Sequence, residues 1–157
     1  MPIQEGQKIP SVRLKETNMQ DVTTDALFAG KKVVVFAVPG AFTPTCSEQH
    51  LPGYIEHADA IREKGVDDIL CVSVNDAFVM DAWGKDRGAE GKVHMLADGN
   101  GDFAQALGLD FDGSGIGFGL RAQRFAMIVD DGLVVKLAVE EPMKFEVSSA
   151  EAILAAL

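Results

Sequence analysis

The apolar residues of this chain follow two patterns: short continuous runs, and longer stretches with helical spacing. Residues 33–38 and 69–74 are almost uninterrupted apolar runs of strand length. Such runs are typical of strands that are covered on both faces. Between them, apolar residues of the stretch 46–64 share one helical face, and Gly65 follows as a plausible helix C-terminus. The pattern therefore predicts a strand, a helix and a second strand.

The start of this helix carries the most informative residues. Thr43 is predicted to be its N-cap and Pro44 its first residue, where the missing N–H costs nothing. Pro52 and Gly53 fall inside the same stretch and should kink it or split it in two. Cys46 is thereby predicted to lie in the first turn of a helix, at the carboxyl end of a buried strand.

The rest of the chain continues the alternation of strands and helices. The further predicted elements are a helix over 77–86, a strand over 93–97, a helix over 102–107 capped by Asp102, a loop over 112–119, strands over 124–129 and 133–138, and a last helix capped by Ser148 or Ser149 and ending at 157. Asp131 and Gly132 give a strong hairpin signal between the two late strands. Parallel units followed by an antiparallel hairpin indicate an α/β protein with a mixed central sheet and helices on both faces.

This order is the one expected of a thioredoxin-like fold with insertions. Without an internal repeat, low-complexity tract or linker, residues 1–157 are predicted to form a single domain. Apolar residues make up 47% of the chain and charged residues 24%, as in ordinary soluble globular proteins.

Charge and hydropathy exclude several partners. The formal net charge of −10 argues against a nucleic acid or an anionic membrane, because binding to either needs clustered Lys and Arg. No apolar run approaches the roughly 20 residues that span a bilayer. The N-terminus lacks the basic start and apolar core of a secretory signal, so we expect a cytoplasmic protein, although a transit peptide removed upstream would leave no trace.

The two cysteines differ in their predicted surroundings. Backbone N–H groups and the helix dipole favour an anion at a helix N-terminus, so the position of Cys46 suits a thiolate. The alternative, a buried structural cysteine, is less typical of a capped helix start. Cys71 lies in mid-strand and is expected to be a small core residue. Its alternative role, a resolving thiol, requires the two Cα atoms to lie within about 7 Å, or local unfolding.

The segment from Pro39 to Cys46 resembles the peroxiredoxin active-site signature, Pro-x-x-x-Thr-x-x-Cys. The longer string of residues 38–47, with His-Leu-Pro-Gly at 50–53, resembles the type II (peroxiredoxin-5-like) group. Further collinear matches are Lys64-Gly-Val, Ser73-Val-Asn-Asp-Ala-Phe-Val, Leu96-Ala-Asp-Gly and Arg124-Phe-Ala. The resemblance covers almost the whole chain. It implies a thiol peroxidase that reduces hydrogen peroxide and small alkyl hydroperoxides in antioxidant defence and redox homeostasis.

The same resemblance implies catalytic roles for four residues. Cys46 would attack one peroxide oxygen and become a sulfenic acid, and Arg124 matches the active-site arginine of the family. Thr43, three residues before the cysteine, can place its hydroxyl beside the sulfur as well as cap the helix. Pro39 would shield the sulfur, or be a simple turn proline. The alternative for the arginine is Arg121 in that role, with Arg124 at the surface.

His50 lies four residues after Cys46, so one helical face could carry both. It could support the surroundings of the cysteine, make a plain polar contact, or act as the base of a thiol hydrolase. Such bases usually come from distant segments. A zinc site built on these two residues lacks two further ligands at sensible spacing, so no metal is expected.

The reductant and the partners follow from the resemblance and from one departure. Some relatives carry a resolving cysteine near the C-terminus, whereas residues 145–150 contain none. This implies an external thiol reductant and no cofactor, with glutathione and glutaredoxin favoured over thioredoxin. The resemblance also implies a homodimer, for which four aromatic residues could form an exposed patch or instead pack into the monomer core: Phe42, Phe78, Trp83 and Phe118. A rival class is a redox-regulated binding or holdase protein, in which oxidation of Cys46 exposes a partner surface.

Overall fold

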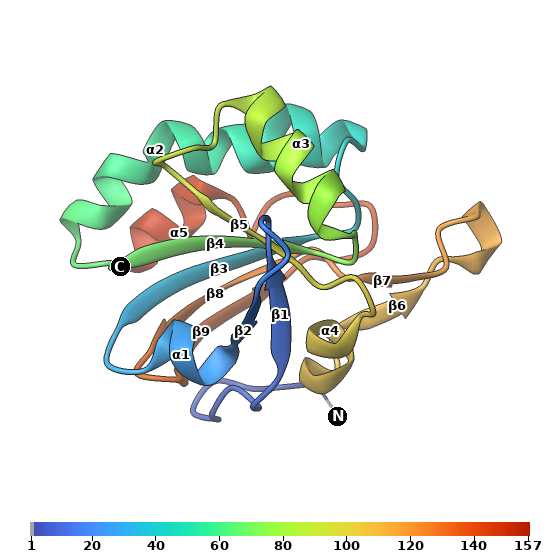
Figure 1. Cartoon of the computed structure of the whole chain (residues 1–157). Coiled ribbons are helices and arrows are strands. Elements are labelled where there is room, and N and C mark those ends of the chain that lie inside the picture. Colours follow the sequence, from blue (N-terminus) through green and yellow to red (C-terminus); the bar gives the residue numbers. More distant parts are fainter. Residues whose placement is uncertain (1) are drawn as a thin grey trace.

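A seven-stranded mixed sheet with helices on both faces forms the centre of the computed structural model, which describes residues 2–157 (Figure 1). The strands of this sheet are β1 (Arg13–Glu16), β2 (Asp21–Thr23), β3 (Lys32–Val38), β4 (Asp68–Ser73), β5 (His94–Ala97), β8 (Phe125–Asp130) and β9 (Leu133–Val139). Their order across the sheet is β2-β1-β5-β4-β3-β8-β9. Strands β3, β4 and β5 are parallel, and β1, β8 and β9 run antiparallel to their neighbours. The predicted α/β architecture is confirmed.

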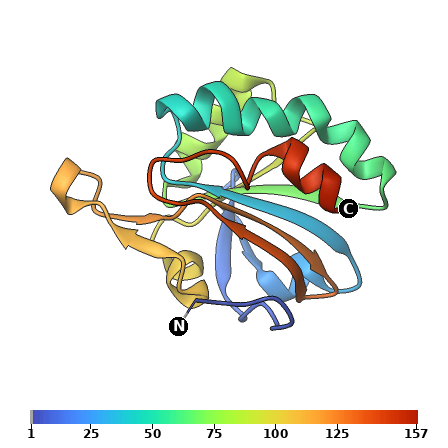
Figure 2. The ribbon, with the colours of Figure 1, turned by 180° about the vertical axis from the view of Figure 1, so that it is seen from behind.

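Within residues 2–157, five α-helices cover the sheet. They are α1 (Thr24–Phe28), α2 (Leu51–Glu63), α3 (Ala77–Arg87), α4 (Asp102–Leu107) and α5 (Ala150–Ala156). Figures 1 and 2 show α2, α3 and α5 on one face of the sheet, and α1 and α4 on the other. A small hairpin of β6 (Asp110–Asp112) and β7 (Leu120–Ala122) projects from the main sheet. The predicted loop over 112–119 joins these two strands and contains a 3-10 turn at Ser114–Ile116, whereas the strands themselves are not among the predicted elements.

Strand β3 is the centre of two hydrophobic cores. Because successive side chains of a strand point to opposite faces, alternate residues of its apolar run serve different layers. Phe36 and Val38 join the cluster beneath α2, α3 and α5, while Val35 and Ala37 join the cluster beneath α1 and α4. The end of β3 is therefore held rigidly from both sides.

The helix that follows β3 differs from the prediction. Helical backbone begins at Pro44 and continues without a break to Glu63, so of the two outcomes predicted for Pro52 and Gly53, a kink or a split, the split is wrong. A π-helical turn spans Cys46–His50, and the Leu51 N–H bonds to the carbonyl of Cys46, five residues earlier. This wide turn shifts the register of the backbone hydrogen bonds just before Pro52. Proline has no N–H to donate, and the shift places this missing donor at the start of α2, where a helix tolerates it.

Two other predicted caps have different outcomes. Ser149 caps α5 through its side chain, which accepts from the Ala152 N–H, as one of the two predicted alternatives. Asp102, in contrast, is the first residue of α4 rather than its cap. The carboxylate of Asp98 accepts the N–H groups of Phe103 and Ala104, each at 3.0 Å, and so satisfies the helix start.

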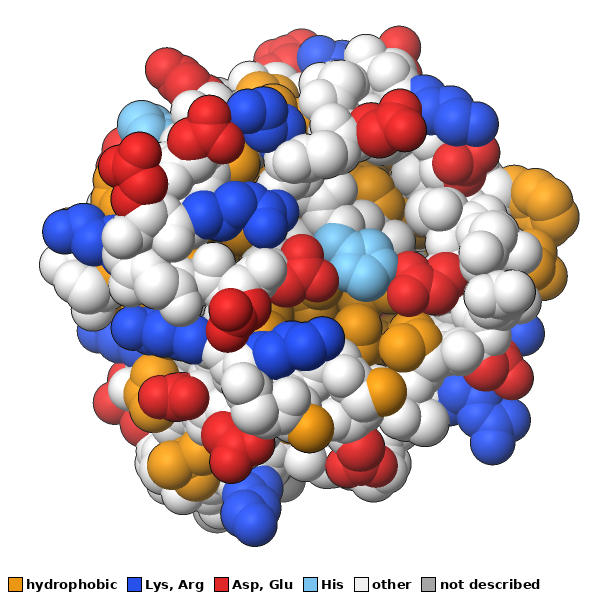
Figure 3. All heavy atoms as spheres, turned by 60° about the vertical axis from the view of Figure 1, so that its left-hand side comes forward, with side chains coloured by type: hydrophobic (Ala, Val, Ile, Leu, Met, Phe, Trp, Pro, Cys, Tyr) orange, Lys and Arg blue, Asp and Glu red, His pale blue; other side chains and the backbone are white. Residues whose placement is uncertain are grey.

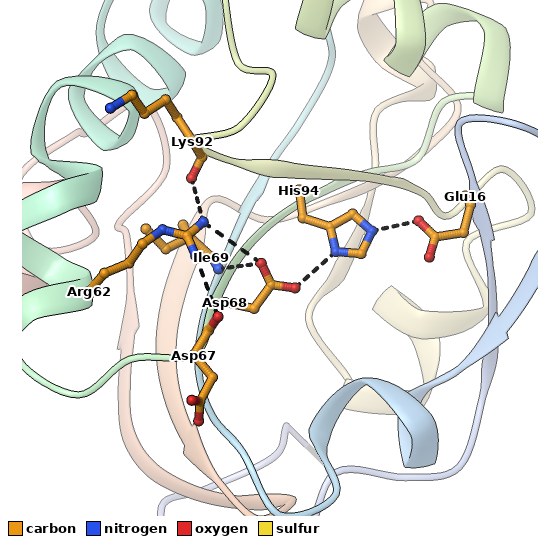
Figure 4. Close-up of polar contacts among 7 residues, drawn as sticks. All are labelled: Glu16, Arg62, Asp67, Asp68, Ile69, Lys92 and His94. Carbon is orange, nitrogen blue, oxygen red and sulfur yellow. Dashed lines mark hydrogen bonds and ion pairs between the residues drawn. The ribbon is translucent and has the colours of Figure 1, made fainter.

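A charged cluster joins the starts of β4 and β5 to the end of β1 (Figure 4). His94 Nδ1 lies 2.9 Å from Asp68 Oδ2, and its Nε2 lies 2.5 Å from Glu16 Oε1. Hydrogen bonding to Asp68, opposed by partial burial and reinforced by Glu16, raises the pKa of His94 to about 9. Arg62 approaches the other oxygen of Asp68 at 4.0 Å. Since the parallel strands β4 and β5 begin here, the cluster lies at the amino ends of these strands, at the opposite end from the carboxyl end of β3.

The surface mixes both signs of charge. On the face drawn in Figure 3, basic side chains are interspersed with acidic ones around a shallow hollow that contains a histidine and apolar groups. Within residues 2–157, no helix has the length and apolar character that crossing a membrane requires.

Candidate active site

The turn between β3 and the helix is fixed by local hydrogen bonds. The Thr43 hydroxyl donates to the carbonyl of Gly40 at 2.6 Å, and the Ala41 N–H donates to Asn75 Oδ1 at 3.0 Å. Phe42 has a φ of 64°, a left-handed conformation that non-glycine residues rarely adopt. The turn is therefore held in one conformation, which sets where the following helix begins.

Thr43 occupies the N-cap position but does not cap. Its carbonyl accepts the N–H of Ser47 at 2.9 Å, as expected for a helix that begins at Pro44. Its hydroxyl donates to Gly40 and, among residues 2–157, accepts no helix amide, so the predicted capping bond is wrong. The side chain instead closes the turn that leads into the helix.

Arg124 faces the sulfur of Cys46. It directly precedes β8, whose pairing with β3 places Phe125 beside Ala37, near the carboxyl end of β3. The Nη2 group donates to Cys46 Sγ at 3.0 Å. Cys46 itself is 0% exposed. The guanidinium therefore makes a direct contact with the sulfur of the predicted nucleophile.

His50 holds the other side of the guanidinium. Its Nδ1 lies 2.8 Å from Arg124 Nη1, and its Nε2 lies 3.0 Å from the carbonyl oxygen of Ser148. A guanidinium only donates and a carbonyl only accepts, so the contacts select the neutral ring with its proton on Nε2. Burial, with the charge of Arg124, lowers the pKa of His50 to about 3. With both nitrogens engaged, the geometry disfavours the hydrolase-base alternative.

Arg121 has different partners. Its Nε donates to the carbonyl of Phe118 at 2.9 Å, and its Nη1 donates to the carbonyl of Pro39 at 3.3 Å. Pro39 is half-buried at the end of β3. The arginine beside the sulfur is thus Arg124, and Arg121 secures the preceding proline.

Cys71 lies in the core on β4, beside Phe36 of β3. It is 0% exposed, and burial raises the pKa of its thiol well above the usual range. It shares a hydrophobic cluster with Cys46, and both are free thiols. Its surroundings are those of a small core residue.

The four aromatic residues of the predicted patch separate into two groups. Phe42 and Phe78 are 51% and 69% exposed. Trp83 is fully buried and donates from Nε1 to Ser47 Oγ at 2.8 Å, so it belongs to the core. Phe118 is half-buried and lies beneath the guanidinium of Arg121.

One residue of the network is absent from the sequence expectations. Glu140 follows β9 and is 7% exposed, and its carboxylate binds the segment that carries Ser148. The only sequence signal is an acidic residue directly after an apolar strand, which is ordinarily a strand end. Among residues 2–157, no group of three or more His, Cys, Asp or Glu side chains is arranged to hold a metal ion.

A buried thiol at a helix start, facing a guanidinium at the carboxyl end of an interior strand, is the arrangement expected of a redox-active thiol protein. The redoxin family profile matches residues 4–154. The chain is 49% identical to "Peroxiredoxin-2C" of Oryza sativa subsp. japonica over 99% of both chains, and 46% identical to "Peroxiredoxin-2B" of Arabidopsis thaliana, again over 99% of both. The crystal structure of reduced Prx3 in complex with H2O2 from Vibrio vulnificus superposes with a TM-score of 0.95 at 59% identity, covering 98% of each chain.

The chain belongs to the redoxin family, as a type II peroxiredoxin with a thioredoxin-like fold. Its activity is that of a thiol peroxidase with an antioxidant function.

Proposed function

We propose that this peroxiredoxin reduces hydrogen peroxide and small alkyl hydroperoxides through a sulfenic acid on Cys46, which an external thiol then reduces. The observation that supports this most directly is the fork of Arg124. One of its nitrogens lies 3.0 Å from Cys46 Sγ, while the other is held 2.8 Å from His50 Nδ1. A guanidinium fixed in this way faces the sulfur before any peroxide arrives.

In the first half-reaction the Cys46 thiolate attacks one peroxide oxygen. The S–O bond forms as the O–O bond breaks, and the departing oxygen takes a proton and leaves as water or an alcohol. Negative charge spreads over both oxygens in the transition state, so donors fixed nearby stabilise it. Arg124 and the backbone N–H of Cys46 are such donors. The Thr43 oxygen, whose own proton goes to Gly40, can accept the O–H of the peroxide.

The burial of the sulfur favours small substrates. Cys46 is 0% exposed, so a peroxide reaches it only when the side chains that cover it move. The π-helical turn of Cys46–His50 begins at the cysteine, and turns of this kind are frequent at functional sites. Pro39, at the end of β3, restricts the approach from the strand side and shields the sulfur.

In the second half-reaction a thiol from another molecule condenses with the sulfenic acid and releases water. A second thiol then attacks the mixed disulfide and frees Cys46. Cys71 is a poor internal alternative because burial keeps its thiol protonated. Glutathione with glutaredoxin is the favoured reductant because the ending Val147-Ser-Ser-Ala and the two cysteines resemble those of plant-type and bacterial peroxiredoxins that use glutaredoxin. Thioredoxin is the alternative. No cofactor enters either step.

We also infer a cytoplasmic homodimer. The exposed Phe42 and Phe78 supply apolar area for a second copy, and two cysteines without a disulfide framework fit a reducing compartment. Sedimentation of the wild type and of Phe78→Glu tests the dimer: the variant should sediment as a monomer. Equal sedimentation would exclude Phe78 from the interface.

The catalytic proposal is tested by turnover with two reductant systems, glutathione–glutaredoxin and thioredoxin, assayed side by side. Cys46→Ser should abolish peroxide consumption with both, whereas Cys71→Ala should turn over like the wild type. Mass spectrometry of the oxidised wild type should find glutathione attached to Cys46. A disulfide between Cys46 and Cys71, with an inactive but folded Cys71→Ala, would contradict the external-thiol mechanism.

A further inference from the structure

Glu140 concentrates four hydrogen bonds on one carboxylate oxygen. Its Oε2 accepts the backbone N–H groups of Glu146, Val147 and Ser148 at 2.8, 2.9 and 2.8 Å. The Ser148 hydroxyl donates to the same oxygen at 2.7 Å. In addition, the backbone N–H of Glu140 donates to the carbonyl of Arg124 at 3.0 Å, which extends the β8–β9 pairing by one step. The residue therefore joins an irregular segment to the strand end that carries the active-site arginine.

The segment that Glu140 holds contributes two groups to the active site. The carbonyl of Ser148 accepts from His50 Nε2 at 3.0 Å and from the Tyr54 hydroxyl at 2.8 Å. The ring of Phe145 lies edge-on to His50, with centroids 5.0 Å apart, and lies 5.9 Å from Arg124 Cζ. Figure 2 shows this segment, between β9 and α5, passing beside the start of the α2 helix.

We propose that Glu140 is a positioning residue for peroxide reduction, and this inference rests on the proposed roles of Cys46 and Arg124. The carboxylate fixes the backbone of residues 146–148, and with it the Ser148 carbonyl. That carbonyl orients His50, and His50 in turn holds the guanidinium against the sulfur. Glu140 touches neither the sulfur nor the peroxide, so its effect on the reaction passes through these contacts.

The carboxylate suits this position because it satisfies four donors at once, two of them on the buried Ser148 and two on the backbone of the exposed Glu146 and Val147. Burial alone raises the pKa of Glu140, but the hydrogen bonds from Ser148 and the neighbouring backbone lower it overall, so the group stays ionised at neutral pH. Without the carboxylate, three neighbouring N–H groups lose their acceptor. Those of the exposed Glu146 and Val147 can bond water, but the buried Ser148 must move to find a partner. A displacement of His50 by a fraction of an ångström then moves the guanidinium away from Sγ, and misplacement of this size slows catalysis strongly.

The test compares Glu140→Ala with Thr24→Ala, a matched control on the opposite face of the sheet. Thr24 is 2% exposed, and its hydroxyl accepts from the Val12 N–H and donates to the Pro10 carbonyl. Both variants lose buried hydrogen bonds, but only Glu140 contacts the segment of Ser148. Two quantities are measured: the single-turnover rate constant with hydrogen peroxide, and the pH midpoint for alkylation of Cys46 by iodoacetamide.

Glu140→Ala should slow the single turnover by at least about tenfold and move the alkylation midpoint upward. Thr24→Ala should change neither, although its denaturation midpoint falls. Glu140→Gln keeps an acceptor oxygen and should recover most of the rate. If Glu140→Ala loses stability alone, with the rate and the pH midpoint of the wild type, the inference is overturned.

A second variant covers the case in which Glu140→Ala does not fold. Glu140→Asp keeps the charge but shortens the reach by one methylene, and it should show a smaller shift in the same direction; wild-type values would overturn the inference. Arg124→Ala, measured in parallel, distinguishes a failure of the role of Glu140 from a failure of the proposed function. A slow Arg124→Ala with fast Glu140 variants would remove only the role of Glu140, whereas a fast Arg124→Ala would remove the proposed function.

Discussion

The His94 cluster predicts a pH-dependent part of the folding stability, which can be tested by replacing the histidine. Both ring nitrogens face carboxylates, Asp68 on β4 and Glu16 on β1, and Arg62 of α2 also approaches Asp68. The replacement His94→Gln keeps hydrogen-bonding groups of similar reach but carries no proton that titrates in this range. Comparison of the two proteins therefore isolates the contribution of the imidazolium.

The size of this contribution follows from linkage. A rise in the pKa of His94 from 6.5 in the unfolded chain to about 9 in the fold corresponds to roughly 3 kcal/mol. The side chains of the cluster are about 30% exposed, so solvent screens the interaction of His94 with the two carboxylates. We therefore reduce the expected stabilisation to about 1–2 kcal/mol. Because the pKa is raised on folding, the stabilisation is fully present below pH 6.5 and is lost as the pH rises through about 9.

The assay is urea denaturation of the wild type and His94→Gln at pH 6 and pH 9.5, with reductant present. The wild type should be the more stable at pH 6, and its advantage should shrink by about 1–2 kcal/mol at pH 9.5. His57→Gln is the control, since it removes a histidine paired with Glu151, whose side chain is 65% exposed. That pair should contribute little at either pH. An advantage of the wild type over His94→Gln that is equal at both pH values would refute the reasoning.

Three further predictions concern the core and the turns. Cys71→Ala should keep peroxide turnover with an external thiol and lose about 1 kcal/mol of stability in urea denaturation, whereas a folded but inactive variant would contradict the core assignment. Trp83→Phe removes the donor to Ser47 Oγ and should lower the free energy of unfolding by about 1–2 kcal/mol. Denaturation monitored by circular dichroism measures this change, and an unchanged denaturation midpoint would argue against that hydrogen bond. Gly101→Ala should cost about 1–3 kcal/mol, since the position has a φ of 76° and an added Cβ would meet the Leu120 side chain; a thermal midpoint equal to that of the wild type would contradict this.

The centre of the fold was predictable because its strands are buried on both faces. The apolar runs that became β3 and β4 carry enough hydrophobic residues to be recognised without any partner. Strand β1, in contrast, has four residues of which only Leu14 is buried, and its pairing with β5 is a tertiary contact. The β6–β7 hairpin is likewise built from three-residue strands without a buried run. Local sequence holds too little of the information that fixes such edge elements.

The active-site residues also divide into those that the sequence predicts and those whose contacts only the fold reveals. Cys46, Thr43 and Pro39 are close in sequence, so a motif finds them, and the resemblance supplies Arg124. The alternative, Arg121, is excluded only by the antiparallel pairing of β8 with β3, which brings Arg124 to the sulfur.

The sequence did not predict the contacts made by segments without regular secondary structure. Glu140 binds amides six to eight residues further on, in a segment without helical or strand periodicity. The hydroxyl of Thr43 likewise donates to a carbonyl of the preceding turn, and no helix amide of the described residues donates to it. Both sets of hydrogen bonds depend on the conformation of irregular backbone, which the spacing of residues in the sequence does not predict.

The most direct test of the account is the rate at which Cys46 reacts with hydrogen peroxide in Arg124→Lys, measured by stopped flow against the wild type. Lysine keeps the positive charge but carries it on a single nitrogen, so it lacks the planar pair of nitrogens with which the guanidinium contacts His50 and the sulfur. We predict that the second-order rate constant of the variant falls by at least about 100-fold while the fold is retained. A folded Arg124→Lys that reacts as fast as the wild type would contradict the claim that the fixed guanidinium drives peroxide reduction.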